Sequence, residues 1–156
     1  LSFQFIILFS LSIIFSNNHP IRCGIYEEIL NPNRVSIGDH VSIHQHTYIV
    51  GEVTIGNYVG IAAKCSIIAQ THNNSDISVP YKLQGILDQP ISIGNDVWMG
   101  AHSIILGNSK IGDGVVISAG SVVSGEIPPY SVVMGNPGRV FFNRKKGDFR
   151  GKTKEK

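Results

Sequence analysis

The sequence has few of the features that mark disulfide-rich, nucleic-acid-binding or membrane-spanning proteins. Two cysteines among 156 residues cannot build a disulfide framework, so a reducing, cytoplasmic compartment is the simplest expectation. Charged residues make up only 15% of the chain, and no basic segment is interleaved with aromatic residues, so we expect no nucleic-acid partner. A chain of this length fits a single domain.

The longest apolar run is too short for a membrane-spanning helix. Residues 1–15 contain eleven Leu, Ile or Phe, whereas a spanning helix needs roughly 18 or more consecutive apolar residues. No basic residues precede the run, as they would in a signal peptide. We expect residues 1–34 to form an apolar segment followed by an irregular lead-in coil. Packing on the protein, association with the inner face of a membrane, and a membrane-spanning or signal segment all stay open as roles for it.

The far end of the chain is basic. From Arg139 to Lys156 there are eight Lys or Arg against two acidic residues. We expect residues 141–156 to form a basic tail. This tail either frays in solvent or meets an anionic surface, such as the phosphates of a cofactor or a membrane.

Between these ends, a hydrophobic residue recurs every six residues. The six-residue stations hold Ile, Met or Val, and a β-branched or small residue stands two positions before each station. A period of six with an inner period of two is neither a helical stripe nor a simple alternating strand, so it indicates a structural repeat. The stations are Ile37, Ile43, Ile49, Ile55, Ile61, Ile67, Ile93, Met99, Ile105, Ile111, Ile117 and Val123.

Four Ile-Gly-Asp or Ile-Gly-Asn triplets, centred on Gly38, Gly56, Gly94 and Gly112, give the repeat a slower period. Two of their three spacings are eighteen residues, so three sixes form one coil of a triangular prism. The third spacing is thirty-eight, which places a twenty-residue inserted loop at residues 71–90. Because Gly, Asn and Asp tolerate left-handed backbone angles, we expect the triplets to turn the corner in that conformation. The pattern predicts an all-β parallel β-helix of about four to five triangular coils over residues 35–140.

Residues 91–140 carry the most specific motifs. These are Val97-Trp98-Met99-Gly100, Ala119-Gly120-Ser121-Val122-Val123, Ile127-Pro128-Pro129 and Gly135-Asn136-Pro137. With these motifs the sequence resembles the hexapeptide-repeat acyltransferases, in particular the galactoside, maltose and lipopolysaccharide O-acetyltransferases. The resemblance implies a left-handed parallel β-helix and acetyl-CoA as the acyl donor. It also implies a homotrimer whose donor grooves lie between neighbouring β-helices.

The resemblance further implies which residues act on the acceptor. His72, at the start of the inserted loop, matches the family's general base, which takes the proton from a sugar hydroxyl as that hydroxyl attacks the thioester. His46 falls where relatives carry an asparagine that holds the acceptor. Asn73 and Tyr81 belong to the inserted loop, which we expect to shape the acceptor pocket.

The donor-binding residues follow from the same resemblance. A backbone N–H of Gly100 or Ala101 is the expected oxyanion donor, and Arg139 is the candidate phosphate contact. Gly125 stands where relatives commonly carry a lysine, so we expect the phosphate contacts to differ. The expected donor-binding residues are Trp98, Gly100, Ala101, Ala119, Ser124 and Arg139.

The leading hypothesis is an acetyl-CoA-dependent O-acetyltransferase, without a metal, that modifies a sugar hydroxyl in surface polysaccharide or lipopolysaccharide biosynthesis. Its acceptor would be a sugar or a polysaccharide precursor. One alternative is an N-acetyltransferase of an amino sugar or an antibiotic acetyltransferase. Another is a zinc enzyme similar to the γ-class carbonic anhydrases, for which the chain offers His44, His46, His72 and His102. A third is a non-catalytic scaffold, against which the inserted loop and Trp98 argue.

Overall fold

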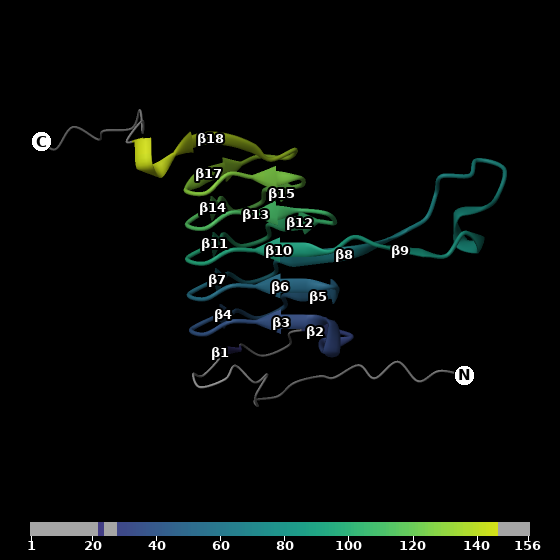
Figure 1. Cartoon of the computed structure of the whole chain (residues 1–156), viewed down its shortest axis with the longest axis horizontal. Helices are drawn as coiled ribbons and strands as arrows, with labels where there is room; N and C mark the ends of the chain where they lie inside the picture. Colours follow the sequence, from purple (N-terminus) through teal and green to yellow (C-terminus); the bar gives the residue numbers. More distant parts are fainter. Residues whose placement is uncertain (1–21, 24–27, 147–156) are drawn as a thin grey trace, which may run out of the picture.

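The computed structural model describes residues 22–23 and 28–146, so most of the segment expected at residues 1–34 lies outside the described residues. The described chain coils into a β-solenoid of about six turns (Figure 1). Each complete turn contributes one short strand to each of three sheets, which we number faces 1, 2 and 3 in the order in which the repeating chain meets them. The prediction of an all-β parallel helix of stacked coils is confirmed.

The three faces are built from short strands. Face 1 contains β3 (Val35–Ile37), β6 (Val53–Ile55), β10 (Ile91–Ile93), β13 (Lys110–Ile111) and β16 (Glu126–Ile127). Face 2 contains β1 (Arg22–Cys23), β4 (Ser42–Ile43), β7 (Gly60–Ile61), β11 (Trp98–Met99), β14 (Val116–Ile117), β17 (Ser131–Met134) and β18 (Arg139–Asn143). Face 3 contains β2 (Glu28–Leu30), β5 (Tyr48–Gly51), β8 (Ser66–His72), β12 (Ile104–Leu106) and β15 (Val122–Val123).

Equivalent positions of successive turns stack in register. On face 1, for example, Ile37, Ile55 and Ile93 are paired along neighbouring parallel strands. Both inward series that the six-residue spacing predicts are buried, except for Val35, which is half-buried. Burial of one large apolar side chain contributes roughly 1.5–3 kcal/mol, so the stacked columns supply the core of the solenoid.

The solenoid extends further than the four to five coils that the spacing predicted. Ile29 continues the face 3 column at one end, and Ile127 and Val133 continue the other two columns at the far end. The period of six fails at both places. The 3-10 turn η1 (Pro32–Arg34) lengthens the first interval, and Ile127 follows Val123 after only four residues.

The glycines of the Ile-Gly-Asn and Ile-Gly-Asp triplets do not adopt the left-handed conformation that we expected. In the corners between faces 1 and 2, the residues with left-handed backbone angles lie two positions after these glycines. They are His40, Tyr58 and Asp96, with φ of 57°, 59° and 55°. Glycine is needed for stacking instead, because a Cβ on Gly56 would lie 2.7 Å from the carbonyl carbon of Gly94. The triplets therefore set the spacing between turns.

The insertion predicted at residues 71–90 is an arm that projects away from the stacked turns (Figure 1). Its base is an antiparallel pair formed by the end of β8 and β9 (Ile86–Asp88), and it contains the 3-10 turn η2 (Tyr81–Leu83). The carboxylate of Asp88 accepts hydrogen bonds from Arg34 Nη1 at 2.9 Å and Gln70 Nε2 at 2.8 Å. These bonds hold the base of the arm against the solenoid.

A C-terminal cap covers the last turn. Strand β18 pairs antiparallel with β17, and the 3-10 turn η3 (Arg144–Lys146) follows it. Arg144 Nη1 donates a hydrogen bond to the Gly114 carbonyl at 2.7 Å, and Lys145 Nζ lies 3.8 Å from the centre of the Tyr130 ring. The rest of the basic tail expected at 141–156 lies outside the described residues. The helical segments of the described chain are three-residue turns, none of which could cross a bilayer.

Candidate functional site

The corners that join face 2 to face 3, here called the 2–3 edge, bring several predicted donor-binding residues together. In one turn of the solenoid, the Ser103 N–H donates to the Gly100 carbonyl at 3.3 Å and His102 has a φ of 60°, which is typical of a type II turn. In the next turn, the Gly120 N–H donates to the Ala101 carbonyl at 2.9 Å. Ala101 and Ala119 therefore occupy stacked corners.

The two amides proposed as oxyanion donors are not equivalent. The Gly100 N–H donates to the Ile117 carbonyl at 2.8 Å, so it belongs to the hydrogen bonding between turns. The Ala101 N–H makes no hydrogen bond to any residue that the structure describes. Gly100 also has no room for a side chain, because a Cβ there would lie 2.5 Å from the Ala119 nitrogen. Of the two amides, only that of Ala101 is left to bind a ligand.

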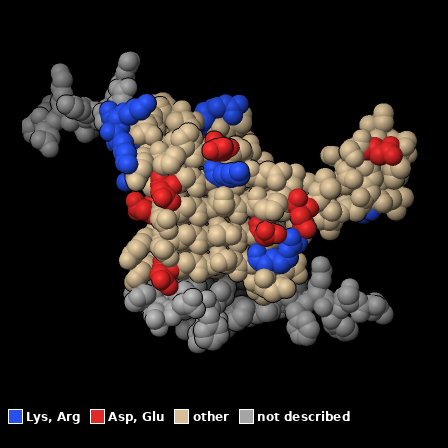
Figure 2. Space-filling model, in the orientation of Figure 1, with Lys and Arg blue, Asp and Glu red and all other residues tan. Residues whose placement is uncertain are grey.

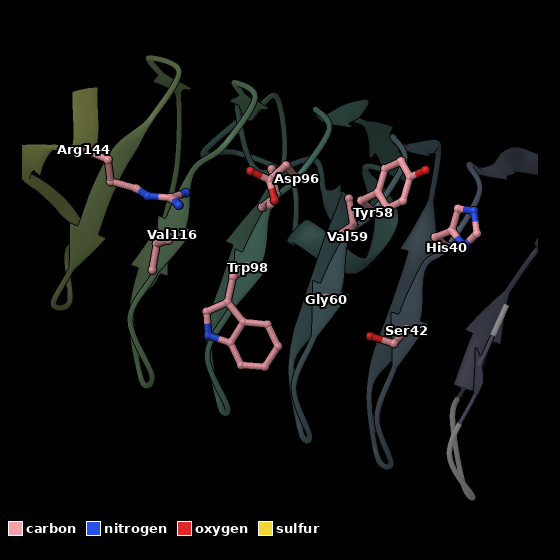
Figure 3. A pocket seen from close by; sticks show the side chains of 10 residues that line it. His40, Ser42, Tyr58, Val59, Gly60, Asp96, Trp98, Val116 and Arg144 are labelled. Atoms are coloured by element: carbon pink, nitrogen blue, oxygen red, sulfur yellow. The ribbon is translucent and has the colours of Figure 1, made fainter.

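Trp98 projects outward from β11, as its position before inward Met99 predicts. Its indole covers Gly60, where a Cβ would lie 2.6 Å from the ring, and the residue remains 47% exposed. Beside it runs an open groove of about 350 Å³ on face 2, with His40 towards one end and Arg144 towards the other (Figure 3). The sequence did not predict that Arg144 lines this groove, because η3 lies beyond the six-residue repeats and its position relative to face 2 does not follow from their spacing.

His46 also lies on the 2–3 edge. It is exposed, adopts a φ of 62° and follows exposed His44 in the corner between β4 and β5. The next turn stacks on this corner through a hydrogen bond from the Lys64 N–H to the Gln45 carbonyl at 3.0 Å. Within residues 22–23 and 28–146, no three His, Cys, Asp or Glu residues are grouped so that they could hold a metal ion.

The arm carries the remaining acceptor residues. His72 is exposed at the end of β8, and its ring packs edge-on against Tyr81 with 5.4 Å between the ring centroids. Tyr81 is 53% exposed. The side-chain oxygen of Asn73 accepts a hydrogen bond from Ser75 Oγ at 2.9 Å, so this oxygen stabilises the loop itself.

The predicted donor-binding residues at the 2–3 edge and the predicted acceptor residues on the arm lie far apart within one chain. Strand β8 begins at the 2–3 edge with Ser66, which pairs with Ile104, and His72 lies six residues further along it. A strand advances about 3.3 Å per residue, so His72 lies about 20 Å from that edge of its own chain. Ser124 occupies the opposite edge of face 3, and Arg139 lies in the cap, where its Nη1 donates to the Gly138 carbonyl. One chain does not bring these predicted residues into a single pocket.

The sequence analysis assigned no role in the site to two buried residues of this region, Ser103 and Cys65. Ser103 Oγ donates to the Gly100 carbonyl at 2.7 Å, and Cys65 Sγ lies 3.3 Å from the same oxygen. The only signal in the sequence is that both are small residues at inward positions, a pattern that predicts burial but no function.

A solenoid built from stacked six-residue repeats defines the class of hexapeptide-repeat proteins. The family described as "Bacterial transferase hexapeptide (six repeats)" matches residues 90–125. The chain is 39% identical over 99 residues to "Probable acetyltransferase Rv3034c" of Mycobacterium tuberculosis, covering 64% of this chain and 32% of that protein. It is 29% identical over 138 residues to "Putative lipopolysaccharide biosynthesis O-acetyl transferase WbbJ" of Escherichia coli, covering 83% and 70%.

Three solved structures that resemble this chain are acetyltransferases as well. A maltose O-acetyltransferase from Clostridium difficile matches with a TM-score of 0.75 and 29% identity, over 80% of this chain and 66% of the other. A galactoside acetyltransferase in complex with coenzyme A matches with a TM-score of 0.71 and 29% identity, over 85% and 71%. A Vibrio cholerae hexapeptide-repeat acetyltransferase complexed with acetyl coenzyme A matches with a TM-score of 0.70 and 25% identity, over 80% and 70%. These comparisons identify the chain as a hexapeptide-repeat protein that is similar to acetyltransferases over most of its own length, as its motifs predicted, and it spans 32% and 70% of the two curated relatives named above.

Proposed function

We propose that this protein transfers an acetyl group from acetyl-CoA to a sugar hydroxyl, with His72 as the general base. The observation that carries the proposal is that the chain presents both an exposed imidazole on the arm and, at the 2–3 edge, an Ala101 N–H that bonds to none of the described residues. A base and an oxyanion donor are what acyl transfer from a thioester requires. Similarity to acetyltransferases solved with coenzyme A or acetyl coenzyme A supports the choice of donor.

In the proposed reaction, His72 removes the proton from the acceptor hydroxyl while the hydroxyl oxygen attacks the thioester carbonyl carbon. The carbonyl oxygen becomes an oxyanion, which the Ala101 N–H stabilises. The new C–O bond forms, the C–S bond breaks, and CoA leaves as a thiolate that takes up the proton from His72. The products are the acetylated sugar and CoA.

The proposed site requires two copies of the chain, because His72 lies about 20 Å from the 2–3 edge of its own solenoid. The outer surface of face 3 is suited to an interface. Its outward side chains are largely apolar, whereas those of face 1 are polar. The apolar residues on face 3 are Tyr48, Ile68, Ile104, Leu106 and Val122, with Glu28 and Ser66 as polar members of the same outward surface; the residues on face 1 are Ser36, Thr54, Ser92, Lys110 and Glu126.

The arm has the surface of an interface as well. Figure 2 shows few charged side chains on the visible face of the arm. Large apolar residues are exposed along it, which in a lone chain would be unfavourable. These residues are Ile77, Val79, Tyr81, Leu83, Ile86 and Leu87. We propose a homotrimer in which the arm of one copy reaches the 2–3 edge of its neighbour.

The acceptor is proposed to be a sugar or polysaccharide precursor, acetylated in the cytoplasm. Similarity to a maltose O-acetyltransferase and to a lipopolysaccharide biosynthesis protein supports a sugar hydroxyl. Exposed Tyr81 and His46 offer polar groups that suit hydroxyl-rich ligands.

The test is a thiol-release assay in which acetyl-CoA is offered with a panel of sugars. His72→Ala should lower kcat by about 10²–10⁴-fold, because a positioned general base contributes that much to proton transfer. Asn74→Ala, an exposed neighbour in the same loop, is the matched control and should keep near-normal activity. Retained activity in His72→Ala would refute the assignment of the base.

A further inference from the structure

We propose that Ser103, together with Cys65, positions the oxyanion-binding amide of Ala101 from inside the solenoid. This inference rests on the proposed function. Ser103 is a positioning residue in this scheme, since it touches neither the acetyl donor nor the sugar acceptor and acts through the Gly100–Ala101 peptide group. The side chains of Ser103 and Cys65 are fully buried behind the 2–3 edge.

Three hydrogen-bond donors converge on the Gly100 carbonyl. The Gly100 oxygen accepts from Ser103 Oγ at 2.7 Å, from the Ser103 N–H at 3.3 Å and from Cys65 Sγ at 3.3 Å. Ser103 Oγ and Cys65 Sγ are themselves 3.4 Å apart. The Ser103 N–H closes the turn, and the two side-chain donors lie in the interior, so the Gly100 carbonyl points into the core.

The planarity of the peptide group sets the direction of the Ala101 N–H. In a planar trans peptide the C=O and N–H groups point in opposite directions, so an inward Gly100 carbonyl turns the Ala101 N–H outward. Rotation of this peptide would leave buried Ser103 and Cys65 without their acceptor, which is unfavourable in a low-dielectric interior. Hydrogen bonds to a carbonyl also polarise the peptide and strengthen its N–H as a donor. The buried pair therefore both aims and strengthens the proposed oxyanion donor.

The neighbouring corner lacks this arrangement. In the next turn, the Ser118 carbonyl accepts from the Ser121 N–H at 3.2 Å, whereas Ser121 Oγ accepts from the Gly135 N–H at 3.1 Å. On the edge between faces 3 and 1, buried Ser109 donates its hydroxyl to the Leu106 carbonyl, three residues earlier, in the same manner as Ser103. Ser109 thus makes an equivalent bond away from the proposed site.

This equivalence gives a matched experiment. Ser103→Ala and Ser109→Ala each remove one buried hydroxyl bonded to the carbonyl three residues earlier, so their melting temperatures should fall by similar amounts. Loss of a whole oxyanion donor lowers kcat by about 10²–10³-fold, so loosening one should lower kcat about tenfold in Ser103→Ala, with an almost unchanged KM for acetyl-CoA. Ser109→Ala should keep the kcat of the unmodified protein.

A conservative variant separates position from packing. Thr47 stands in the same inward column two turns earlier and donates its hydroxyl to the His44 carbonyl at 2.8 Å, so threonine fits this geometry. Ser103→Thr should therefore restore most of the lost kcat. Equal kcat values for Ser103→Ala and Ser109→Ala in an active enzyme would overturn the role of Ser103 and leave the proposed function intact. Absence of acetyl transfer by the unmodified protein would overturn the proposed function itself, and the role of Ser103 with it.

Discussion

At the residue scale, glycine and asparagine set the distance between turns of the solenoid. The side-chain oxygen of Asn57 accepts from the Asp39 N–H at 2.7 Å, and that of Asn95 accepts from the Asn57 N–H at 2.8 Å. Each side-chain amide therefore joins its own corner to the corner of the preceding turn. The adjacent glycine lets the backbones approach closely enough for this bond.

Gly56→Ala should destabilise the solenoid, because its Cβ would lie 2.7 Å from both the carbonyl carbon and the carbonyl oxygen of Gly94. Overpacking of this kind typically costs about 1–3 kcal/mol, and backbone atoms cannot move aside as a flexible side chain would. Chemical denaturation followed by circular dichroism measures the change in the free energy of unfolding.

Thr54→Ala is the control for Gly56→Ala. It lies two residues away on the exposed side of β6 and should change the free energy of unfolding by no more than about 0.5 kcal/mol. If both variants are equally stable, glycine is not required for the close approach of the turns.

At the scale of elements, the arm depends on the polar contacts at its base. The Arg34 guanidinium is the main cause that lowers the pKa of Asp88, through its hydrogen bond, and Gln70 adds to the effect. Because the pKa of Asp88 is lower in the folded than in the unfolded chain, its stabilising contribution is present at neutral pH. This contribution is lost as the pH falls from the ordinary Asp range through the folded pKa.

Asp88 should therefore titrate below the ordinary value of about 3.9 for an aspartate, as measured by the carboxyl carbon shift in NMR. Arg34→Met should return this pKa towards the ordinary value, because it removes the largest cause while keeping the aliphatic stem. Gln70→Ala should raise the pKa less. An unchanged Asp88 titration in Arg34→Met would show that this contact does not form in solution.

At the scale of the whole molecule, the proposed site is shared between copies. His72 and Ala101 lie near opposite ends of face 3, so an active site would combine the arm of one chain with the 2–3 edge of another. Ala101→Pro removes the proposed oxyanion-binding N–H at the 2–3 edge and leaves the arm unchanged. Proline lacks the N–H and is favoured at the second position of a type II turn, so the corner should keep its shape.

Mixing two inactive variants tests this sharing. His72→Ala and Ala101→Pro should each lose activity alone, whereas co-expression in equal amounts should restore about a quarter of normal turnover. A site is intact only when the arm comes from Ala101→Pro and the edge comes from His72→Ala, and each condition is met about half the time. The thiol-release assay measures the recovery.

The control for this mixture uses His72→Ala with a chain that carries both substitutions. This pair contains no intact arm and should stay inactive at every ratio. If the two single variants fail to complement each other, His72 of one chain and Ala101 of another do not act in one site, which would contradict the proposed arrangement.

The sequence by itself determined the solenoid and the position of the arm. Both depend on short-range spacing: an inward residue every six positions can be buried only by stacking on its equivalents in neighbouring turns, and the one long spacing must leave the stack. The ends were harder to predict, because the intervals before Ile37 and after Val123 break the period. The resemblance to the O-acetyltransferases singled out His72 at that interruption, but the sequence does not specify which residues face it.

Only the tertiary structure decided how the proposed site residues are distributed. It separated the amide of Gly100, which bonds to the next turn, from that of Ala101, and it brought Cys65 to the Gly100 carbonyl across thirty-five residues. It also placed His72 far from Ala101 on the same face. These relations depend on which turn stacks on which and on where an extended strand ends. A sequence period specifies which side chains point inward, but not what they bond to.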